Sequence, residues 1–531
     1  MNHRQRWTLI AAVLGSSIVF VDSSVVTVAL PKIGRELPTT VLGVLEGQLY
    51  VYAGYLLTLS ALLILAGALS DFYGRRRVFL IGLVGFGLTS VLCGLAPNME
   101  FLVVSRILQG AAGAILVPGS LALLTAAFTG EAQGRAYGVW AAATAATTIL
   151  GPFLGGVLVD TISWRVAFLI NVPLVVAAVW ATALYVPESR NEKATGHFDW
   201  LGAAVVAIAV GGLSFGATYG QQRDWRDPLA YVALAAGVVA TIAFPFLMRR
   251  NRDPLVPLEL FRSRNFTVTN ISTLLIYGAL YVTFYYLALF LQGVLGYSAS
   301  AAGLAGIPGG VLLVVLSTRF GALAVRYGPK IFMTVGPALM AIGVLWFARV
   351  PATSPAWVFT PGDLSTWFPP RDWFVDFLPG QIIFGFGLAM MVAPLTTALM
   401  TSVPVSNSGV ASAVNNAISR VGPQLAGAVI FVAITASFYS GIAARIPGTD
   451  TSDPAFRHDY PPMTVPRCPA SCPPEVTARI EDARDQSTQA FHLAMYVGAA
   501  LLVAGALVNA VGISDEAARE ATRRRTPMTT V

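Results

Sequence analysis

Long apolar segments recur from one end of this 531-residue chain to the other, and they constrain the fold more than any other feature. Each has about 20 residues or more, the length that an α-helix needs to cross a hydrocarbon core about 30 Å thick. Hydrophobic residues make up 55% of the chain and charged residues 11%, whereas a soluble domain has roughly 25% charged residues. We therefore expect an all-α polytopic membrane protein. The fourteen expected spans are 8–30, 44–69, 78–96, 101–127, 135–159, 166–187, 200–220, 228–248, 266–293, 301–325, 331–350, 376–402, 409–441 and 488–512.

The positions of the basic residues predict how these helices are oriented. Lys and Arg are retained on the cytoplasmic side, so their number in short loops sets the topology. Here they are more numerous in the short loops on the side of the N-terminus. We expect a multi-pass protein of the inner, cytoplasmic membrane with both termini in the cytoplasm. The formal net charge of +7 follows from this topology and does not indicate a nucleic-acid partner.

Several chemistries are missing from the sequence. No GxxxxGK[ST] phosphate loop occurs, which argues against ATP as the energy source. The four histidines are scattered, so we expect no metal site, and no nucleophile–base constellation indicates an enzyme. Cys468 and Cys472 fall in a long external loop, where they form either a disulfide or two free thiols. The sequence therefore predicts a protein that has no cofactor and is driven by an ion gradient.

A short polar motif occurs twice between apolar segments. GALSDFYGRRRVFLIG covers residues 67–82 and GALAVRYGPKIFMTVG covers residues 321–336. Both copies fall in short cytoplasmic loops, after the second and the tenth expected span. Two copies on the same side imply two halves related by an axis along the membrane normal. The matching pairs are Gly67/Gly321, Ala68/Ala322, Leu69/Leu323, Tyr73/Tyr327, Gly74/Gly328 and Gly82/Gly336.

This repeat predicts the domain organisation. We expect an N-terminal six-helix bundle at 1–187 and a C-terminal six-helix bundle at 266–513, which includes the external loop 442–487. The segment 188–265 is expected to be a linker that adds two transmembrane helices between the bundles. Residues 514–531 are expected to form a cytoplasmic tail.

The first copy of the motif has residues suited to a gate. Gly67 removes a side chain and so permits close helix packing, and Asp71 can cap the positive N-terminal end of another helix. Arg75 and Arg76 are expected to pair with Asp71 or with lipid headgroups. An alternative is that these charges only anchor the loop on the cytoplasmic side. The expected gating residues are Gly67, Asp71, Gly74, Arg75 and Arg76.

Asp22 is the acid that lies deepest within an expected span. An ionisable group near the bilayer centre costs several kcal/mol unless it is paired or hydrated, and it is therefore a functional candidate. Arg106 is the best available cation, and we expect Asp22 and Arg106 to couple proton binding to substrate binding. A purely structural polar contact is the alternative. Glu46 is a second candidate acid, or else an ordinary interfacial residue.

The substrate site is expected to combine Asp22 with aromatic and amide side chains. Aromatic faces attract organic cations, although Tyr and Phe in a span also serve as packing or as an interfacial belt. Arg420 either neutralises an anionic substrate or satisfies helix carbonyls. The expected substrate-binding residues are Asp22, Glu46, Tyr50, Tyr55, Phe284, Tyr285, Tyr286, Gln292, Asn415 and Asn416.

Several motifs together resemble one family. VDSSVVTVALP, GALSDFYGRRR, RILQG, GPFLGG and SWRVAFLINVP occur in the order and in the spans typical of the fourteen-span drug:proton antiporter family of the major facilitator superfamily. The chain departs from that pattern at Thr27, Thr147, Tyr50 and Val325, where the family usually has Asn, Gly, Trp and Asp.

The resemblance implies a fold and roles for two of the motifs. It implies that Asp71 meets the helix entered through SNSG (406–409), and that GPFLGG is the antiporter motif associated with exporters. Its small residues and proline suit a helix that packs closely and bends. The residues of this motif are Gly138, Gly151, Pro152, Gly155 and Gly156.

We therefore expect a monomeric, proton-coupled antiporter that exports amphipathic, cationic organic compounds or drugs by alternating access of two six-helix bundles. A dedicated exporter of one metabolite or lipid would share every coupling motif. A proton-coupled importer would contradict the direction that the antiporter motif implies, and a membrane receptor is a further, less favoured alternative.

Overall fold

The computed structural model is all-helical and describes residues 1–39, 44–190, 198–223, 225–251, 253–360, 363–446, 450–451, 453, 456–457, 460–465 and 473–515. Thirteen helices in this part of the chain are long and apolar enough to cross a membrane. The expected span 135–159 lies in a further helix of 32 residues. Each of the fourteen expected segments therefore corresponds, within a few residues at its ends, to one helix or to two consecutive helices. Cys468 and Cys472 lie outside the described residues.

The N-terminal helices pack on one another around buried aliphatic and aromatic side chains. The first helix packs on the fifth, the seventh and the fourth, and the second packs on the fourth. Asn2 and Gln5 form a capping box that starts the first helix, so its beginning is defined by the sequence. These helices are α1 (His3–Glu36), α2 (Val44–Tyr73), α3 (Arg75–Gly94), α4 (Met99–Ala127), α5 (Gly130–Thr161), α6 (Val166–Leu169) and α7 (Asn171–Tyr185).

Two further helices, α8 (Trp200–Gln222) and α9 (Pro228–Arg250), pack on each other. Of the two, α8 also lies against α2 of the N-terminal group and against a long helix of the C-terminal group. Asp227 caps α9, and its carboxylate accepts hydrogen bonds from the Tyr219 hydroxyl and from the Leu229 backbone N–H. These two hydrogen bonds lower the pKa of the Asp227 carboxyl.

The C-terminal helices form a second packed group with its own buried core. They are η1 (Leu258–Arg262), α10 (Arg264–Leu289), η2 (Phe290–Val294), α11 (Ala299–Ala305), α12 (Ile307–Tyr327), α13 (Lys330–Phe347), η3 (Leu364–Trp367), α14 (Trp373–Asp376), α15 (Leu378–Thr401), η4 (Val405–Asn407), α16 (Ser408–Arg445) and α18 (Pro474–Gly512).

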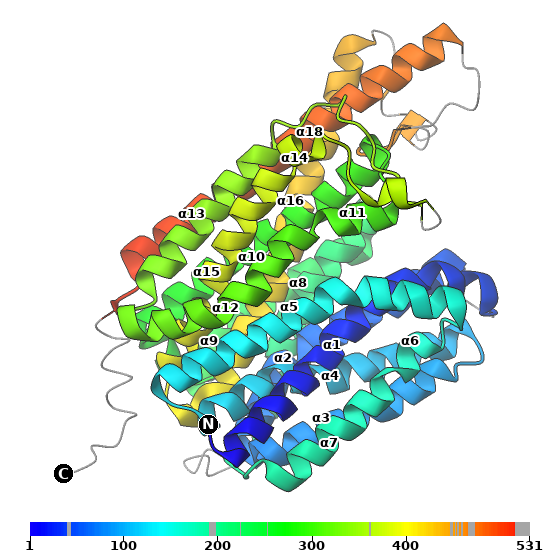
Figure 1. The fold of residues 1–531 in the computed structure, drawn as a ribbon. Helices are drawn as coiled ribbons and strands as arrows, with labels where there is room; N and C mark the ends of the chain where they lie inside the picture. The colour runs from blue at the N-terminus through cyan, green and yellow to red at the C-terminus, as the bar shows by residue number, and fades with distance from the viewer. Residues whose placement is uncertain are drawn as a thin grey trace.

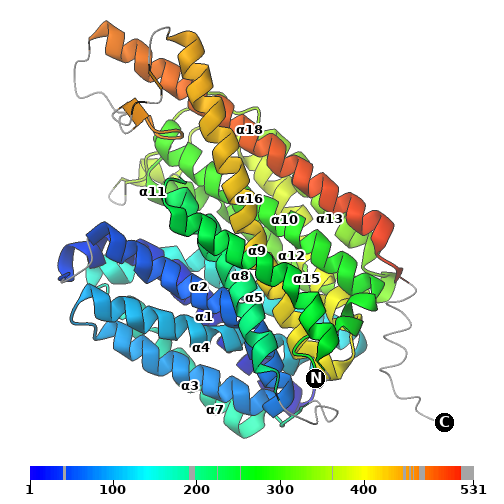
Figure 2. The same cartoon turned by 180° about the vertical axis from the view of Figure 1, so that it is seen from behind.

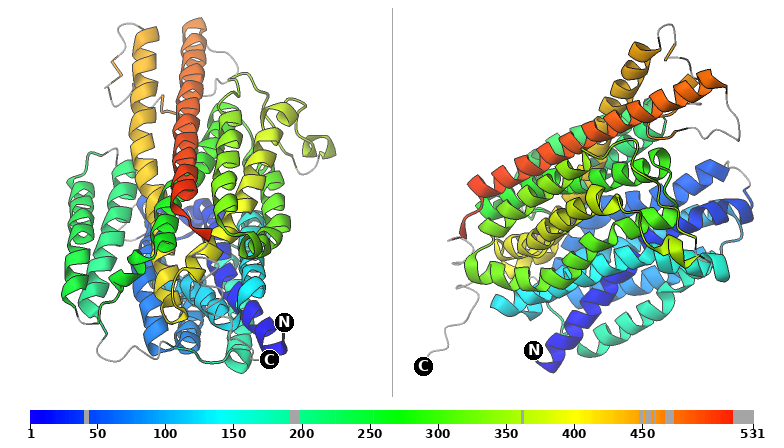
Figure 3. Two further views of the ribbon diagram at one scale, coloured as in Figure 1. Left: turned by 90° about the vertical axis from the view of Figure 1, so that its left-hand side faces the viewer. Right: turned by 45° about the horizontal axis from the view of Figure 1, so that its top comes forward.

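The chain begins and α18 ends at the same end of the bundle, called the terminal end below (Figure 1). Arg264 at the start of α10 donates hydrogen bonds to the carbonyls of Gly512 and Val511 there. From this end the ribbons of the N-terminal and C-terminal helices spread apart toward the opposite end (Figures 1 and 2). At that opposite end α16 and α18, with 38 and 39 residues, extend beyond the other helices (Figure 3).

The two copies of the repeated motif adopt the same local geometry. A glycine with positive φ ends the helix in each copy, with Gly74 at 111° and Gly328 at 99°. A carboxylate then accepts backbone N–H groups at the start of the next helix: Glu188 from Arg76, and Asp515 from Lys330. Only glycine adopts such φ values at low cost, so the repeat of sequence reflects a repeat of structure.

Candidate functional site

Asp22 lies within α1 and is completely buried. Its carboxylate accepts three hydrogen bonds: from Arg106 Nη1 at 2.5 Å, from Gln109 Nε2 at 3.1 Å and from Asn171 Nδ2 at 2.9 Å. Its helical neighbours are apolar, but the donors come from α4 and α7. The structure therefore brings Asp22 and Arg106 together as an ion pair, as the sequence led us to expect.

Arg106 is also completely buried and is held from several directions. Its Nε donates to the Val51 carbonyl at 3.2 Å, and its Nη1 also donates to Gln109 Oε1 at 2.7 Å. The centre of its guanidinium group lies 3.9 Å from the centroid of the Tyr55 ring, a cation–π contact. Tyr55, one of the predicted substrate residues, thus contacts the ion pair rather than standing apart from it.

The surroundings of this ion pair match the ionised form of Asp22. An ionised carboxylate only accepts hydrogen bonds, and the three donors around Asp22 match that form. Adding a proton would remove the counter-charge of Arg106 in a place from which water is excluded, and an unpaired buried charge is strongly destabilising. Arg106 Nη2 and Asn171 Oδ1 already have no hydrogen-bond partner within the described structure. A change in the protonation of Asp22 must therefore be accompanied by rearrangement of its neighbours.

Three members of this cluster were not predicted as site residues. Gln109, one turn after Arg106 on α4, bridges Asp22 to Ser90, whose hydroxyl lies 2.7 Å from Gln109 Nε2. Asn171 reaches the same carboxylate from α7. The sequence feature that could have indicated these three residues is that each is polar and lies within an apolar segment.

The predicted gate residue Asp71 caps another helix. Its Oδ2 accepts the backbone N–H of Val410 at 3.0 Å, in the first turn of α16. Its Oδ1 accepts from Arg75 Nε at 3.0 Å and Nη2 at 2.9 Å, and Arg75 also donates to the Val405 carbonyl. The carboxylate thus lies at the positive end of the α16 dipole, in the position that the resemblance implied.

Arg76 does not join this contact. Its Nη2 donates to the Ala183 carbonyl at 2.5 Å, and its backbone N–H donates to Glu188. Arg76 therefore connects the start of α3 to the end of α7.

Close helix contacts accompany the charges at the terminal end. A Cβ at Gly67 would lie 2.5 Å from the Cβ of Ala413 on α16, so a side chain at residue 67 has no room. The second copy of the motif makes the corresponding contact between α12 and α5, where Gly321 meets Gly134. Val325 replaces the acid there, and its Cγ2 would lie 2.7 Å from a Cβ at Gly134. The contact between α2 and α16 is therefore charged, and the contact between α5 and α12 is apolar.

The residues of the predicted antiporter motif contact two different helices. A Cβ at Gly138 would lie 2.5 Å from Thr318 Cα on α12, and Ser317 Oγ donates to the Gly138 carbonyl at 2.9 Å. Gly155 packs against Val25 of α1, and Gly151 packs against Ser24. Pro152 and Gly156 lie in α5, but their side-chain surroundings are outside the described part of the structure. The motif thus joins α5 to α1 and to the C-terminal group.

The other predicted substrate residues are spread over different surroundings. Tyr50 lines a pocket between α2, α4 and α8, and the side chain of Glu46 is not described. Phe284 packs edge-on against Phe384, Tyr285 is 60% exposed, and Tyr286 is buried in the core of the C-terminal group.

The polar members of the predicted set are equally dispersed. Gln292 is exposed in η2. Asn415 donates to Asn270 Oδ1 at 3.1 Å and to Thr273 Oγ1 at 2.9 Å, and Asn416 donates within its own helix to Ser412. The structure does not bring these side chains together with the Asp22 cluster.

Side chains from both groups of helices approach each other near the Asp22 cluster. Tyr52 on α2 interacts electrostatically with Arg106 of its own group and with Tyr281 and Arg420 of the C-terminal group. Tyr281, on α10, is 48% exposed. Tyr281 and Arg420 of the C-terminal group therefore lie on the side of the N-terminal group that carries Tyr52 and Arg106.

A bundle of membrane-length helices, with a buried ion pair on one side and close contacts between two helix groups at one end, is the architecture of an integral membrane protein built from two packed groups of helices. Among the described residues, no group of His, Cys, Asp and Glu is arranged to hold a metal ion.

Comparisons with known proteins identify the family. Residues 12–427 match the Major Facilitator Superfamily. The chain is 33% identical over 463 residues to the multidrug resistance protein Stp of Mycobacterium tuberculosis, covering 86% of this chain and 81% of the other. It is 32% identical over 430 residues to the tetracenomycin C resistance and export protein of Streptomyces glaucescens, with 80% and 75% covered. It is 30% identical over 437 residues to the methylenomycin A resistance protein of Bacillus subtilis, with 82% and 89% covered.

Solved structures agree on the fold. The human organic anion transporter MFSD10 gives a TM-score of 0.58 at 14% identity, covering 94% of this chain and 100% of the other. The proton:xylose symporter XylE gives a TM-score of 0.55 at 16% identity, covering 95% and 94%. The chain belongs to the Major Facilitator Superfamily, and it is a multi-pass membrane transporter rather than an enzyme.

Proposed function

We propose that this transporter exports amphipathic, cationic organic molecules from the cell in exchange for protons. The observation that carries the proposal is the completely buried Asp22–Arg106 pair, 2.5 Å between Nη1 and Oδ2, in a family of membrane transporters. The names of the relatives, which describe resistance to multiple drugs, tetracenomycin C and methylenomycin A, favour export over import.

In the proposed cycle a proton and the substrate compete for the charge of Asp22. With Asp22 ionised, the region between the helix groups attracts a cation. A proton that arrives from outside neutralises Asp22, weakens that attraction and favours release of the substrate to the outside. Loss of the proton to the cytoplasm restores the charge. The cycle uses the proton gradient as its energy source and needs no cofactor.

The proposed orientation puts the terminal end in the cytoplasm of the cell. Asp71 then closes the cytoplasmic end through α16, and the glycine contact between α5 and α12 closes it on the other side. Both contacts would break as access changes from one side of the membrane to the other. Asp22 is completely buried in the present state, so proton exchange would require the other states of the cycle.

Export from inverted membrane vesicles tests this proposal. Ethidium, an amphipathic organic cation, is added outside the vesicles and a pH gradient is imposed with the interior acidic. We expect uptake that collapses when the pH gradient is removed and that is lost in Asp22→Asn. Glu131→Gln, which removes an exposed acid at the terminal end, is the matched control and should transport normally. Uptake by Asp22→Asn with unchanged pH dependence would overturn the coupling role, and Glu46 would be the next acid to test.

A dedicated exporter of a single compound is the second candidate. The name of the Streptomyces glaucescens relative refers to resistance to and export of one compound, tetracenomycin C. Competition separates the two functions: a multidrug exporter should show mutual inhibition between ethidium and chemically unrelated lipophilic cations, whereas a dedicated exporter should not.

A further inference from the structure

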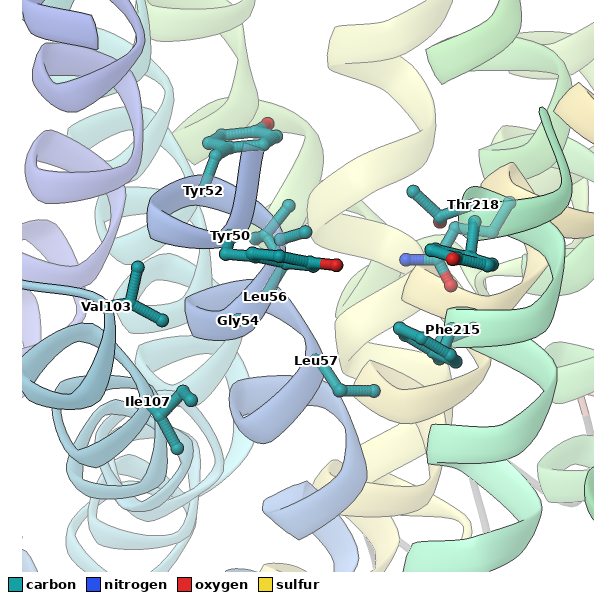
Figure 4. A pocket seen from close by; sticks show the side chains of 13 residues that line it. Tyr50, Tyr52, Gly54, Leu56, Leu57, Val103, Ile107, Phe215 and Thr218 are labelled. Carbon is teal, nitrogen blue, oxygen red and sulfur yellow. The ribbon is translucent and has the colours of Figure 1, made fainter. Parts of the chain in front are cut away.

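A pocket of about 210 Å³ lies to the side of the Asp22 cluster, between α2, α4 and α8, with Gln424 of α16 also in its wall. Most of its wall is apolar and includes Leu56 and Leu57 of α2, Val103 and Ile107 of α4, and Phe215 of α8 (Figure 4). Figure 4 shows the Tyr50 ring lying across the pocket from α2 toward the helix that carries Phe215 and Thr218. The pocket therefore lies where the inserted helix α8 meets the N-terminal group.

The pocket borders a row of exposed apolar side chains on α4. Ile107 is 38% exposed, and its neighbours Val104 and Leu108 on α4 are 57% and 50% exposed. Large exposed apolar side chains on a membrane-spanning helix contact acyl chains. A molecule dissolved in the bilayer can therefore reach this pocket without passing through water.

Two buried polar atoms in the wall have no partner. Ser214 is 2% exposed, and its Oγ has no hydrogen-bond partner within the described structure. The same is true of Gln424 Oε1, which comes from α16. The hydroxyl of Tyr219 is already bonded to Asp227 at 2.7 Å and is not available. An unsatisfied buried polar atom costs about 1–3 kcal/mol, so a molecule that satisfies it binds more tightly than a purely apolar one.

The lining and the size of the pocket restrict what it can hold. None of the lining residues carries a charge, so a charged group would enter without a counter-ion. Pockets for drug-sized ligands have about 300–1,000 Å³, and this one is smaller. It suits one alkyl chain with a single hydroxyl or amide group that can bond Ser214 Oγ or Gln424 Oε1.

We propose that this pocket binds an uncharged, single-chain amphipathic molecule taken from the bilayer, and that the bound molecule slows transport by stabilising the state with the terminal end closed. This second site goes beyond the proposed exporter function, because it is separate from the Asp22 cluster and needs no proton.

The position of the pocket supplies the link to the conformational cycle. Tyr52 of α2 and Gln424 of α16 line it, and Gly67 and Gly409 of the same two helices touch at the terminal end. In both helices 15 residues separate the two places, or about 22 Å at 1.5 Å per residue. When α2 and α16 move relative to each other, the shape of the pocket changes. A ligand that fits only the present shape shifts the population toward it.

Photolabelling tests binding without depending on transport. The purified full chain in lipid nanodiscs is irradiated with dodecanol that carries a diazirine in mid-chain, and the labelled peptides are identified by mass spectrometry. We expect label on α2 and α8 around residues 50–57 and 214–219. Thr218→Trp, which fills the pocket, should remove that label, and Ser214→Ala should weaken it about fivefold, the effect of one neutral hydrogen bond.

The matched control is Ile208→Trp, which adds the same side chain at a 50% exposed site on the same helix outside the pocket. It should keep the label. Equal labelling of Thr218→Trp and Ile208→Trp, or label spread evenly over the lipid-facing helices, would overturn the binding site.

Transport measurements test the effect of the bound molecule. Dodecanol should lower the maximal rate of ethidium uptake without changing the ethidium concentration for half-maximal rate, and Ser214→Ala should need about fivefold more dodecanol for the same inhibition. Inhibition that disappears at high ethidium concentration would place dodecanol in the substrate site instead. Equal sensitivity of Ser214→Ala and the unmodified chain would contradict a role for this pocket in the inhibition.

Discussion

Replacing Asp71 by Asn should shift the contact between α2 and α16 toward its open form by about hundredfold. In the closed form the carboxylate accepts bonds of 2.9 and 3.0 Å from Arg75 and of 3.0 Å from the Val410 N–H. The side chains of Arg75 and Asp71 are only 2% and 6% exposed. Removing one partner of a buried pair costs about 3–5 kcal/mol, because the other charge stays buried and unpaired.

The lower end of this range applies, because Asn keeps one oxygen that can accept the Val410 N–H. About 3 kcal/mol at 1.4 kcal/mol per tenfold change gives the hundredfold shift. The cost applies to the closed form alone, since opening lets water reach Arg75. Adding Arg75→Met to Asp71→Asn removes the unpaired charge and should return part of the closed population.

A buried serine at the other closing contact reports the shift. Ser317 is 0% exposed where α12 meets Gly138, so a cysteine there should react with a membrane-impermeant maleimide only when the terminal end opens. Ser317→Cys is placed in a chain whose native cysteines, Cys93, Cys468 and Cys472, are replaced, and labelling is followed in inverted vesicles. Asp71→Asn should speed labelling strongly.

Glu131→Gln is the control, because its pair with Arg135 is more than half exposed and such a pair contributes about 0–1 kcal/mol. Equal labelling rates in Asp71→Asn and Glu131→Gln would refute the gate assignment and leave Asp71 and Arg75 only as an anchor of the loop.

Three further predictions concern the ion pair, the glycine contacts and the helix caps. Asp22→Asn should lower the apparent melting temperature in detergent through a loss of about 3–5 kcal/mol, and Arg106→Gln added to it should recover part of the loss; an unchanged melting temperature in Asp22→Asn would argue against the buried pair. Gly138→Ala should hinder closure and reduce the transport rate, because its Cβ would lie 2.5 Å from Thr318 Cα and overpacking costs about 1–3 kcal/mol. Gly303→Ala is the control, because a Cβ there has nothing within 4 Å, and equal transport rates in the two variants would count against the contact. Glu188→Ala and Asp515→Ala should each destabilise the chain by about 0.5–2 kcal/mol through loss of a helix cap, and a melting temperature unchanged in both would contradict the shared geometry of the two motif copies.

Much of the fold was predictable because membrane crossing imposes length and apolar composition on each helix. A helix-end contact of Asp71 was predictable as well, since a carboxylate after an apolar span has few uses other than a helix end or a cation, whereas the identity of that helix came from the resemblance to a family. The pairing of Asp22 with Arg106 followed from the cost of an isolated charge within a span. In each case one strong energetic term leaves few possible arrangements.

The rest of the site depends on which helices become neighbours. Residue spacing along a single helix does not reveal this. Helical spacing showed apolar neighbours around Asp22, yet its hydrogen-bond partners Gln109 and Asn171 come from other helices. Tyr50 and Tyr55 are five residues apart on α2, but Tyr55 covers Arg106 while Tyr50 lines the lateral pocket. Tyr286 is buried in the C-terminal core beside the exposed Tyr285, since neighbouring residues on a helix face different surroundings.

Proton movement driven by the substrate is the most direct test of the proposed exchange. The purified chain is reconstituted in liposomes that contain a pH-sensitive dye, ethidium is added on one side without any pH gradient, and the internal pH is followed. We predict that an ethidium gradient drives protons in the opposite direction, that Asp22→Asn abolishes this movement, and that Glu131→Gln retains it. Ethidium transport without proton movement, or proton movement that persists in Asp22→Asn, would contradict the proposal that Asp22 couples the two.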